Sequence, residues 1–231
     1  MANETATGPN PTDGASARER IIAAFMALLA EKPFERIGLA EIATAAAVSL
    51  ATLRAEFESP LAILAAHVKE IDRAVLEAGG DDMKDEPPRE RLFDVLMRRL
   101  ETLEPHKAAM RSLVRSAMRN PGLAVALNSL AVRSQQWMLT AADIRASGPK
   151  GVVRAQGLAV LFASVVRTWI DDDDPGHART MAALDRALAR GQSWSGLLDG
   201  LCGISRRLCR AMPRRRRGEA GNGVAADRSM G

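Results

Sequence analysis

The sequence has no tyrosine, and its aromatic residues make up only 3% of 231 residues. Its two cysteines, Cys202 and Cys209, are too few for a disulfide framework or for a zinc site of their own. No segment approaches the roughly 18 consecutive apolar residues of a membrane span. The first twenty residues are too polar for a secretory signal. We therefore expect a protein of a reducing cytoplasm.

The motifs of the common enzyme classes are also missing. The sequence has no phosphate-cradling glycine loop, no nucleophile elbow and no dinucleotide fingerprint. Its three histidines, His67, His106 and His177, are isolated from any cysteine or carboxylate at metal-ligand spacing, so we expect them at the surface or at helix ends. These absences predict a protein that is not an enzyme and that has no catalytic residues, cofactor or metal.

The charge of the chain is unevenly distributed. Lysine and arginine number 32 against 28 acids, which gives a formal net charge of +4 and a pI near 9.6. Residues 204–231 alone contain eight arginines and two acids, so residues 1–203 carry a net charge of −2. A basic total indicates an anionic partner only where the charge is concentrated. In this chain the positive charge is concentrated in the C-terminal tail.

Helix signals follow one another along most of the chain. Apolar residues recur at helical spacing. Helix starts are marked by Ser16 with Glu19, by Ser49 and by Ser59-Pro60. No alternating strand pattern is present. We predict an all-α fold of about ten helices, in which the segment Leu123–Arg145 forms one helix or two.

Composition shifts divide the chain into five regions. The clearest boundary is the segment GGDDMKDEPP at residues 79–88. The predicted regions are a disordered lead-in (1–15), a helix-turn-helix head (16–78), a helical body for ligand binding and dimerisation (89–191), an amphipathic basic helix with a polybasic cluster (192–217) and a disordered tail (218–231).

Residues 40–57, AEIATAAAVSLATLRAEF, have the spacing of a helix-turn-helix, with a short helix, a turn near Ala46–Val48 and a second helix capped by Ser49. With its flanking segments, this head resembles the TetR family of transcriptional regulators over about residues 17–66. The resemblance implies a homodimer that binds operator DNA through the head and a small molecule in the body. By position, it assigns phosphate or base contacts to Ser49, Thr52 and Arg54, and we add the exposed Leu50 as a thymine-methyl contact.

The head departs from the family pattern at three positions. Ala47, Arg54 and Pro60 stand where the family usually has glycine, tyrosine and lysine. Over residues 16–60 five basic residues face six acids, a net charge of −1. Because non-specific DNA affinity comes mainly from positive charge, we expect DNA binding to be weak or to depend on few residues.

The body carries a second resemblance. The segments at residues 89–113 and 168–188 are similar to the lipid-binding accessory proteins of coenzyme Q biosynthesis, which share the TetR-like fold and do not act as repressors. This resemblance implies an apolar pocket that holds an isoprenoid. The candidate pocket residues are Met97, Met110, Trp137 and Phe162, although filling of the core explains the same side chains.

The acidic run Asp171–Asp174 permits two interpretations. Carboxylates are hard ligands for a divalent cation, but Asp174 before Pro175 is also typical of a helix start, where acids stabilise the positive end of the helix dipole. We favour the helix start.

The segment at residues 194–217 reads as an amphipathic helix that ends in a polybasic cluster. One face is apolar, and the other is rich in arginine. This pattern is typical of helices that bind anionic membrane surfaces. Two alternatives are packing on the body or a second subunit, and contact with nucleic acid. The candidate anion contacts are Trp194, Arg206, Arg207, Arg210, Arg214, Arg215, Arg216 and Arg217.

Overall fold

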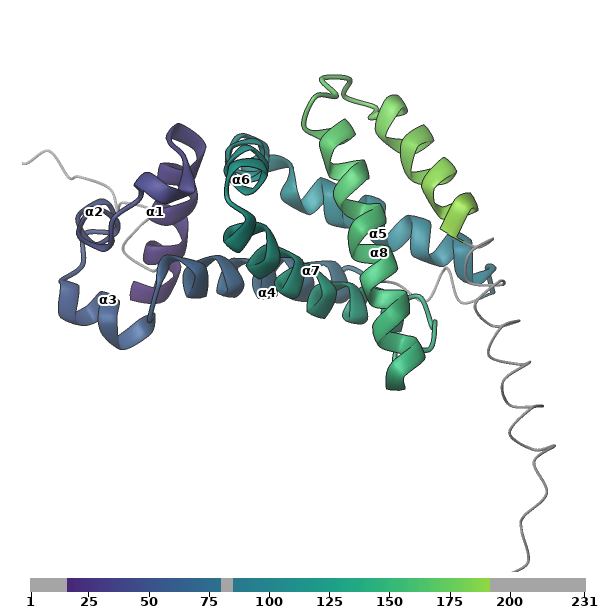
Figure 1. Ribbon diagram of the computed structural model, residues 1–231, viewed down its shortest axis with the longest axis horizontal. Helices are drawn as coiled ribbons and strands as arrows, with labels where there is room; N and C mark the ends of the chain where they lie inside the picture. Colours follow the sequence, from purple (N-terminus) through teal and green to yellow (C-terminus); the bar gives the residue numbers. More distant parts are fainter. Residues whose placement is uncertain (1–15, 80–84, 192–231) are drawn as a thin grey trace, which may run out of the picture. The chain divides into compact units, whose positions relative to one another are not determined.

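The computed structural model describes residues 16–79 and 85–191, and within these ranges the chain is helical without a strand. The helices in chain order are α1 (Ala17–Glu31), α2 (Leu39–Ala45), α3 (Leu50–Glu56), α4 (Pro60–Glu77), α5 (Pro88–Leu103), α6 (Lys107–Arg119), α7 (Pro121–Ala141) and α8 (Gly148–Trp169), followed by a helix at residues 178–191. Two 3₁₀ turns, η1 (Phe34–Arg36) and η3 (Glu104–His106), lie between them (Figure 1). The all-α prediction is confirmed.

The helix starts are those that the local sequence signals predict. Ser16 accepts a hydrogen bond from the backbone N–H of Glu19 while the Glu19 carboxylate binds the Ser16 N–H, which completes the capping box. The Ser59 hydroxyl caps α4 by accepting the N–H of Ala62, with Pro60 in the first turn, where its missing N–H has no cost. The segment after Asn120 is one helix, α7, which ends at Ala141.

One predicted helix start is displaced. We expected a helix from Asp174-Pro175, but the last described helix begins at residue 178. The Asp174 carboxylate accepts hydrogen bonds from the N–H groups of Gly176 and Ala178 (3.3 and 3.1 Å), and His177 has a φ of 50°. The aspartate therefore closes a turn before the helix and still caps its first residue.

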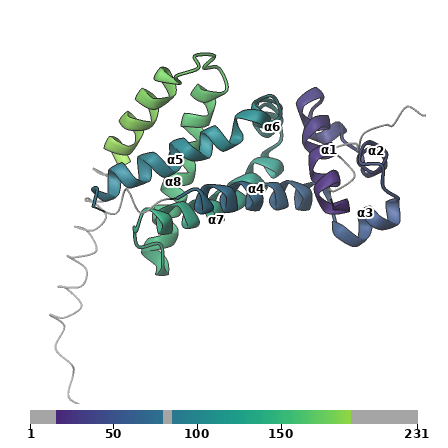
Figure 2. The same cartoon turned by 180° about the vertical axis from the view of Figure 1, so that it is seen from behind.

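Two apolar clusters organise the helices. The first joins α1, α2, α3 and the N-terminal half of α4, and it also takes Ala109 and Leu113 from α6 and Leu123 from α7. The second joins the C-terminal half of α4 to α5, α7, α8 and the helix at 178–191. Helices α4 and α7 pack side by side, as both views show (Figure 2). We call the four-helix part with the first cluster the head and the remainder the body.

Helix α8 is long and apolar enough to cross a membrane, but its buried face packs into the body. Eight of its residues, among them Phe162 and Trp169, are buried within the described part of the chain. Helix α8 is therefore a core helix of the body.

Candidate nucleic-acid interface and helical body

The turn between α2 and α3 has helix-turn-helix geometry. The Val48 N–H donates to the Ala43 carbonyl (3.0 Å), and Ala47 adopts a φ of 51°. This left-handed conformation is one that glycine adopts freely and alanine does not. The turn therefore requires a left-handed residue at position 47, and Ala47 adopts this conformation at a cost in stability.

Helix α3 presents Ser49, Leu50 and Thr52 at its N-terminal end and Arg54 in its last turn. The Ser49 hydroxyl caps the helix by accepting the Thr52 N–H (3.0 Å), and it lies 2.9 Å from the Thr52 hydroxyl. Leu53 anchors the opposite face in the head cluster. Leu50 is 57% exposed and Arg54 is exposed, so both are accessible to a partner.

Several cations of the head are already engaged inside it. Arg18 lies 3.6 Å from the Glu56 carboxylate and 4.6 Å from the centre of the Phe57 ring, and Lys32 pairs with Glu41. Within the described residues, neither Arg36 nor Arg54 makes an ion pair. The head therefore offers few cations to a phosphate backbone.

The predicted pocket residues do not all come together. Met97 and Phe162 are buried in the body cluster, and Met110 packs against both clusters. Trp137 is 58% exposed on α7, so its assignment to a core or pocket is wrong in the described chain. The α7 face that turns inward is the one with Ser134, Gln135 and Met138.

The body core contains an ion pair that the sequence did not reveal. Arg99 of α5 pairs with Asp72 of α4, and the same carboxylate oxygen accepts the hydroxyl of Ser134 on α7 (2.7 Å). All three residues are buried. The guanidinium also lies 5.8 Å from the centre of the Phe162 ring. Asp72 and Arg99 are 27 positions apart, so no local spacing could have signalled the pair.

The three histidines gather around η3, and the prediction that all would be surface or capping residues is wrong for His67. This side chain is buried in α4, and its ring meets that of His106 edge to face at 4.5 Å. Burial in an apolar environment, reinforced by the neighbouring His106 and Arg99, lowers the pKa of His67 to about 4. Burial also lowers the pKa of His106. His177 lies 3.6 Å from the Glu104 carboxylate.

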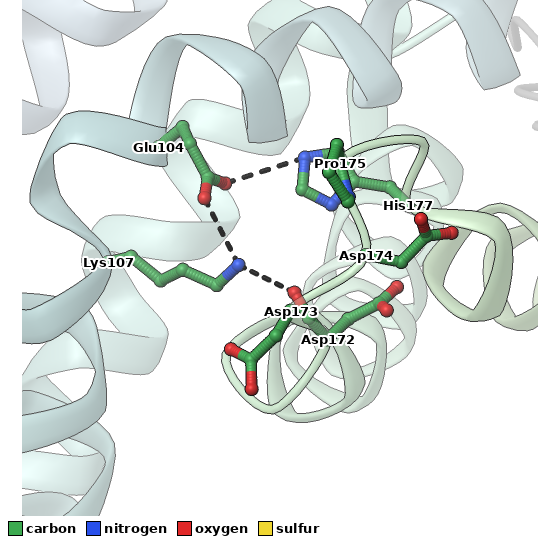
Figure 3. A pocket seen from close by; sticks show the side chains of 7 residues that line it. All are labelled: Glu104, Lys107, Asp172, Asp173, Asp174, Pro175 and His177. Carbon is green, nitrogen blue, oxygen red and sulfur yellow. Dashed lines mark hydrogen bonds and ion pairs between the residues drawn. The ribbon is translucent and has the colours of Figure 1, made fainter.

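The acidic run borders a shallow cavity of about 390 Å³ (Figure 3). The Lys107 ammonium donates to Glu104 (3.1 Å) and to the Asp172 carbonyl (2.8 Å), so an internal cation offsets part of the acidic charge. Asp172 of this run is buried. Its hydrogen bonds from the Thr180 hydroxyl and N–H (2.6 and 2.9 Å) lower its pKa. No group of three or more candidate metal ligands occurs in the described ranges.

Helix α8 exposes a row of small and apolar residues. Val153, Gly157, Val160 and Ser164 follow one another at helical spacing on its exposed side. A Cβ built at Gly157 meets nothing within 4 Å. We call these four residues the α8 stripe. The candidate anion contacts from Trp194 to Arg217 lie outside the described residues.

Solved structures with the same arrangement are transcriptional regulators. A TetR regulator from Nitrosomonas europaea superposes with a TM-score of 0.60 at 22% identity, covering 78% of this chain and 99% of its own. A tetR-family regulator from Streptomyces coelicolor superposes with a TM-score of 0.53 at 17% identity, and the match covers 86% of this chain and 90% of the regulator. A TetR regulator from Rhodococcus sp. RHA1 superposes with a TM-score of 0.51 at 22% identity, and the match covers 76% of this chain and 95% of the regulator. No protein-family model and no curated protein matches the sequence. The similarity thus lies in the backbone: the described chain has the all-α fold of the TetR transcriptional regulators.

Proposed function

We propose that the protein is a TetR-like transcriptional regulator, a homodimer in the cytoplasm that binds operator DNA through α3. The observation that carries this proposal is the helix-turn-helix itself. Its second helix is capped by Ser49, anchored by Leu53 and exposes Leu50 and Arg54 on the outer side. In this motif the N-terminal residues of the second helix contact base edges in the major groove.

The chemistry of α3 defines the kind of contact. Leu50 suits a thymine methyl group, and the Ser49 and Thr52 hydroxyls suit phosphate oxygens or base edges. Arg54 replaces the family's usual tyrosine and can bind a phosphate with its guanidinium. Of the cations of residues 16–60 that make no ion pair in the described ranges, Arg36 and Arg54 are exposed and Arg20 is half-buried, so the exposed arginines of a dimer offer about four phosphate contacts. The salt dependence should then be shallow, with a slope of log K against log salt of about −4.

A gel-shift series with DNA from upstream of the protein's own gene tests the proposal. We expect retardation at low salt, the shallow slope given above, and a loss of about tenfold in affinity for Arg54→Ala. The control is Arg73→Ala, which removes an exposed arginine from α4. Absence of retardation at the lowest salt concentration would refute DNA binding by the head.

The proposed dimer uses the α8 stripe together with the helix at residues 178–191. Small side chains allow two helices to approach closely, and the stripe exposes apolar surface without a partner in the described chain. Val160→Lys should convert the dimer to a monomer in sedimentation experiments, because it places two like charges in the interface. Met118→Lys, at an equally exposed apolar residue of α6, is the matched control and should remain dimeric.

The proposed ligand is an apolar small molecule or lipid in the body, near Met97, Met110 and Phe162. These side chains from α5, α6 and α8 belong to the body cluster or pack against it, and they include two adaptable thioethers. Native mass spectrometry of the purified protein should reveal a bound molecule. A mass equal to that of the bare chain under conditions that retain dimers would count against a resident ligand.

A lipid-binding accessory protein of ubiquinone biosynthesis is the second candidate. The shortage of cations in the head favours it, since a head that does not bind DNA has no need of them. On this alternative, the basic segment at residues 192–217 docks the protein on an anionic membrane. Flotation with anionic liposomes separates the candidates: the accessory protein requires binding by the full chain and its loss in a chain that ends at Gly191.

A further inference from the structure

The last described helix, at residues 178–191, borders a second shallow cavity. Leu184, Ala187 and Leu188 hold this helix in the body cluster. On its neighbouring side, where the helix meets the end of α8, lies a cavity of about 420 Å³. The lining residues are Thr168, Ala178, Arg179, Ala182, Ala183 and Arg186. Its volume falls in the range of roughly 300–1,000 Å³ that small-molecule sites occupy.

Every polar side chain that lines this cavity can donate a hydrogen bond, and two of the three carry a positive charge. No acidic residue of the described chain lines it. The cavity at the acidic run differs, because Lys107 lies among its carboxylates and offsets part of their charge (Figure 3). The cavity on the last helix therefore carries positive charge that none of its lining groups neutralises.

Neither guanidinium forms an ion pair with a carboxylate of residues 16–79 or 85–191. Arg186 is exposed. Arg179 donates to the Asp171 carbonyl (3.4 Å), which restrains the side chain and leaves further N–H donors for a ligand. The Asp171 carboxylate lies 3.8 Å from the Arg111 guanidinium instead. Both lining arginines are therefore available to an anion.

The spacing of the two arginines indicates the shape of that anion. Arg179 and Arg186 are seven positions apart, so they lie on the same side of the helix, about 10.5 Å apart along its axis. Ala182 and Ala183 lie between them and form an apolar floor. A guanidinium binds a carboxylate through two parallel hydrogen bonds. A molecule with a carboxylate at each end of a short hydrocarbon chain matches this order of groups better than a single anion does.

We propose that this cavity binds a small linear dicarboxylate, with one carboxylate on Arg179, the other on Arg186 and the hydrocarbon over the two alanines. Thr168 supplies a further hydroxyl donor from α8. All of these groups belong to one chain. The site therefore requires neither DNA binding nor the proposed dimer.

Isothermal titration calorimetry of the full-length protein with linear dicarboxylates from succinate to suberate tests the site. We expect one dicarboxylate per chain, an optimum at one chain length, and an affinity about tenfold above that for hexanoate, which has a single carboxylate. Arg179→Gln and Arg186→Gln should each remove this advantage over hexanoate. Arg190→Gln, at an exposed arginine of the same helix outside the cavity, is the matched control and should retain it.

A second variant tests the cavity rather than its charge. Ala182→Leu fills the floor without changing a charge and should weaken binding of the best dicarboxylate about tenfold. Ala163→Leu, at an exposed position of α8 outside the cavity, should leave binding unchanged. Equal affinities for dicarboxylates and hexanoate, or unchanged binding by Arg186→Gln, would overturn the site. Inorganic phosphate that binds as tightly as the best dicarboxylate would also overturn it, because one anionic group would then suffice.

The last helix also belongs to the proposed dimer face, so the titration is repeated with the Val160→Lys monomer. A site formed by one chain must bind the dicarboxylate in this monomer, and absence of binding there would contradict the inference. Binding by Val160→Lys but not by the parent protein would support the site and indicate that a second copy covers it. A protein that binds dicarboxylates but retards no DNA would refute the proposed function and leave this site standing.

Discussion

The head and the body are built on different kinds of core. The head cluster consists of apolar side chains from Ile21 to Leu123, without a buried ion pair among the described residues. The body cluster surrounds a buried ion pair, Asp72 with Arg99, and a buried hydroxyl, Ser134. Apolar burial tolerates rearrangement, whereas a buried ion pair is stable only in one geometry. The difference predicts that the two regions respond differently to substitution.

The largest expected effect is at the buried ion pair. Arg99→Met leaves the Asp72 carboxylate buried without its partner and should lower the free energy of unfolding by about 3–5 kcal/mol. Urea denaturation of the variant measures this change. Arg98→Met is the matched control, because Arg98 pairs with Asp94 on the same helix and that partner is partly exposed. The control should lose less than about 1 kcal/mol.

A double variant shows whether the charge or the shape matters. Arg99→Met combined with Asp72→Leu removes both charges and fills the site with apolar atoms, so most of the lost stability should return. If the single and double variants are equally destabilised, packing around Phe162 rather than the unpaired carboxylate causes the loss.

The next effect is a pH dependence that arises at His67, where α4 meets η3 outside both apolar clusters. His67 has a folded-state pKa of about 4, below the value of about 6.5 expected in the unfolded chain. Between these two values the unfolded chain takes up a proton that the folded chain does not. This contribution to stability is present above about pH 6.5, declines as the pH falls, and is lost by about pH 4. Its size is on the order of 3 kcal/mol.

His67→Gln isolates this contribution. The variant keeps a polar side chain of similar length but cannot be protonated, so its free energy of unfolding should fall less steeply between pH 6.5 and 4 than that of the parent protein. His177→Gln, at a histidine beside Glu104, is the comparison. An unchanged slope in His67→Gln would show that carboxylates elsewhere account for the acid sensitivity.

Local signals in the sequence were sufficient for most of the helices and for the starts of α1, α3 and α4. Ser16, Ser49 and Ser59 cap their own helices through bonds to residues three positions away, so a short window contains both partners. The end of α1 before Lys32-Pro33 has an equally local cause, since the proline ring and its missing N–H act on neighbouring residues.

The candidate sites depended on information that a short window does not hold. Helix α7 carries alanine, leucine and valine on most of its faces, so its pattern did not indicate that Trp137 points outward. His67 is buried because α4 packs against η3, and Asp72 is paired because α5 lies beside α4. These features arise from the packing of helices distant in sequence, which periodicity alone does not specify.

The smallest expected effect compares left-handed residues in the two regions. Ala47 in the head has a φ of 51°, and Asp143 in the body has a φ of 54°. This conformation costs an alanine roughly 1–2 kcal/mol, while an aspartate tolerates it better. The Asp143 carboxylate also lies 3.6 Å from the Arg91 guanidinium, but an ion pair with so exposed a carboxylate contributes little. Glycine removes the strain but adds unfolded-state freedom that offsets about 0.5–1 kcal/mol of the gain. Ala47→Gly should therefore raise the free energy of unfolding by about 0.5–1 kcal/mol in urea denaturation, and Asp143→Gly should change it by less than half as much.

The affinity for DNA should stay the same in Ala47→Gly if the alanine already holds the turn in its binding geometry. A gain in affinity larger than about threefold would instead show that the alanine strains the helix-turn-helix away from the shape that DNA requires.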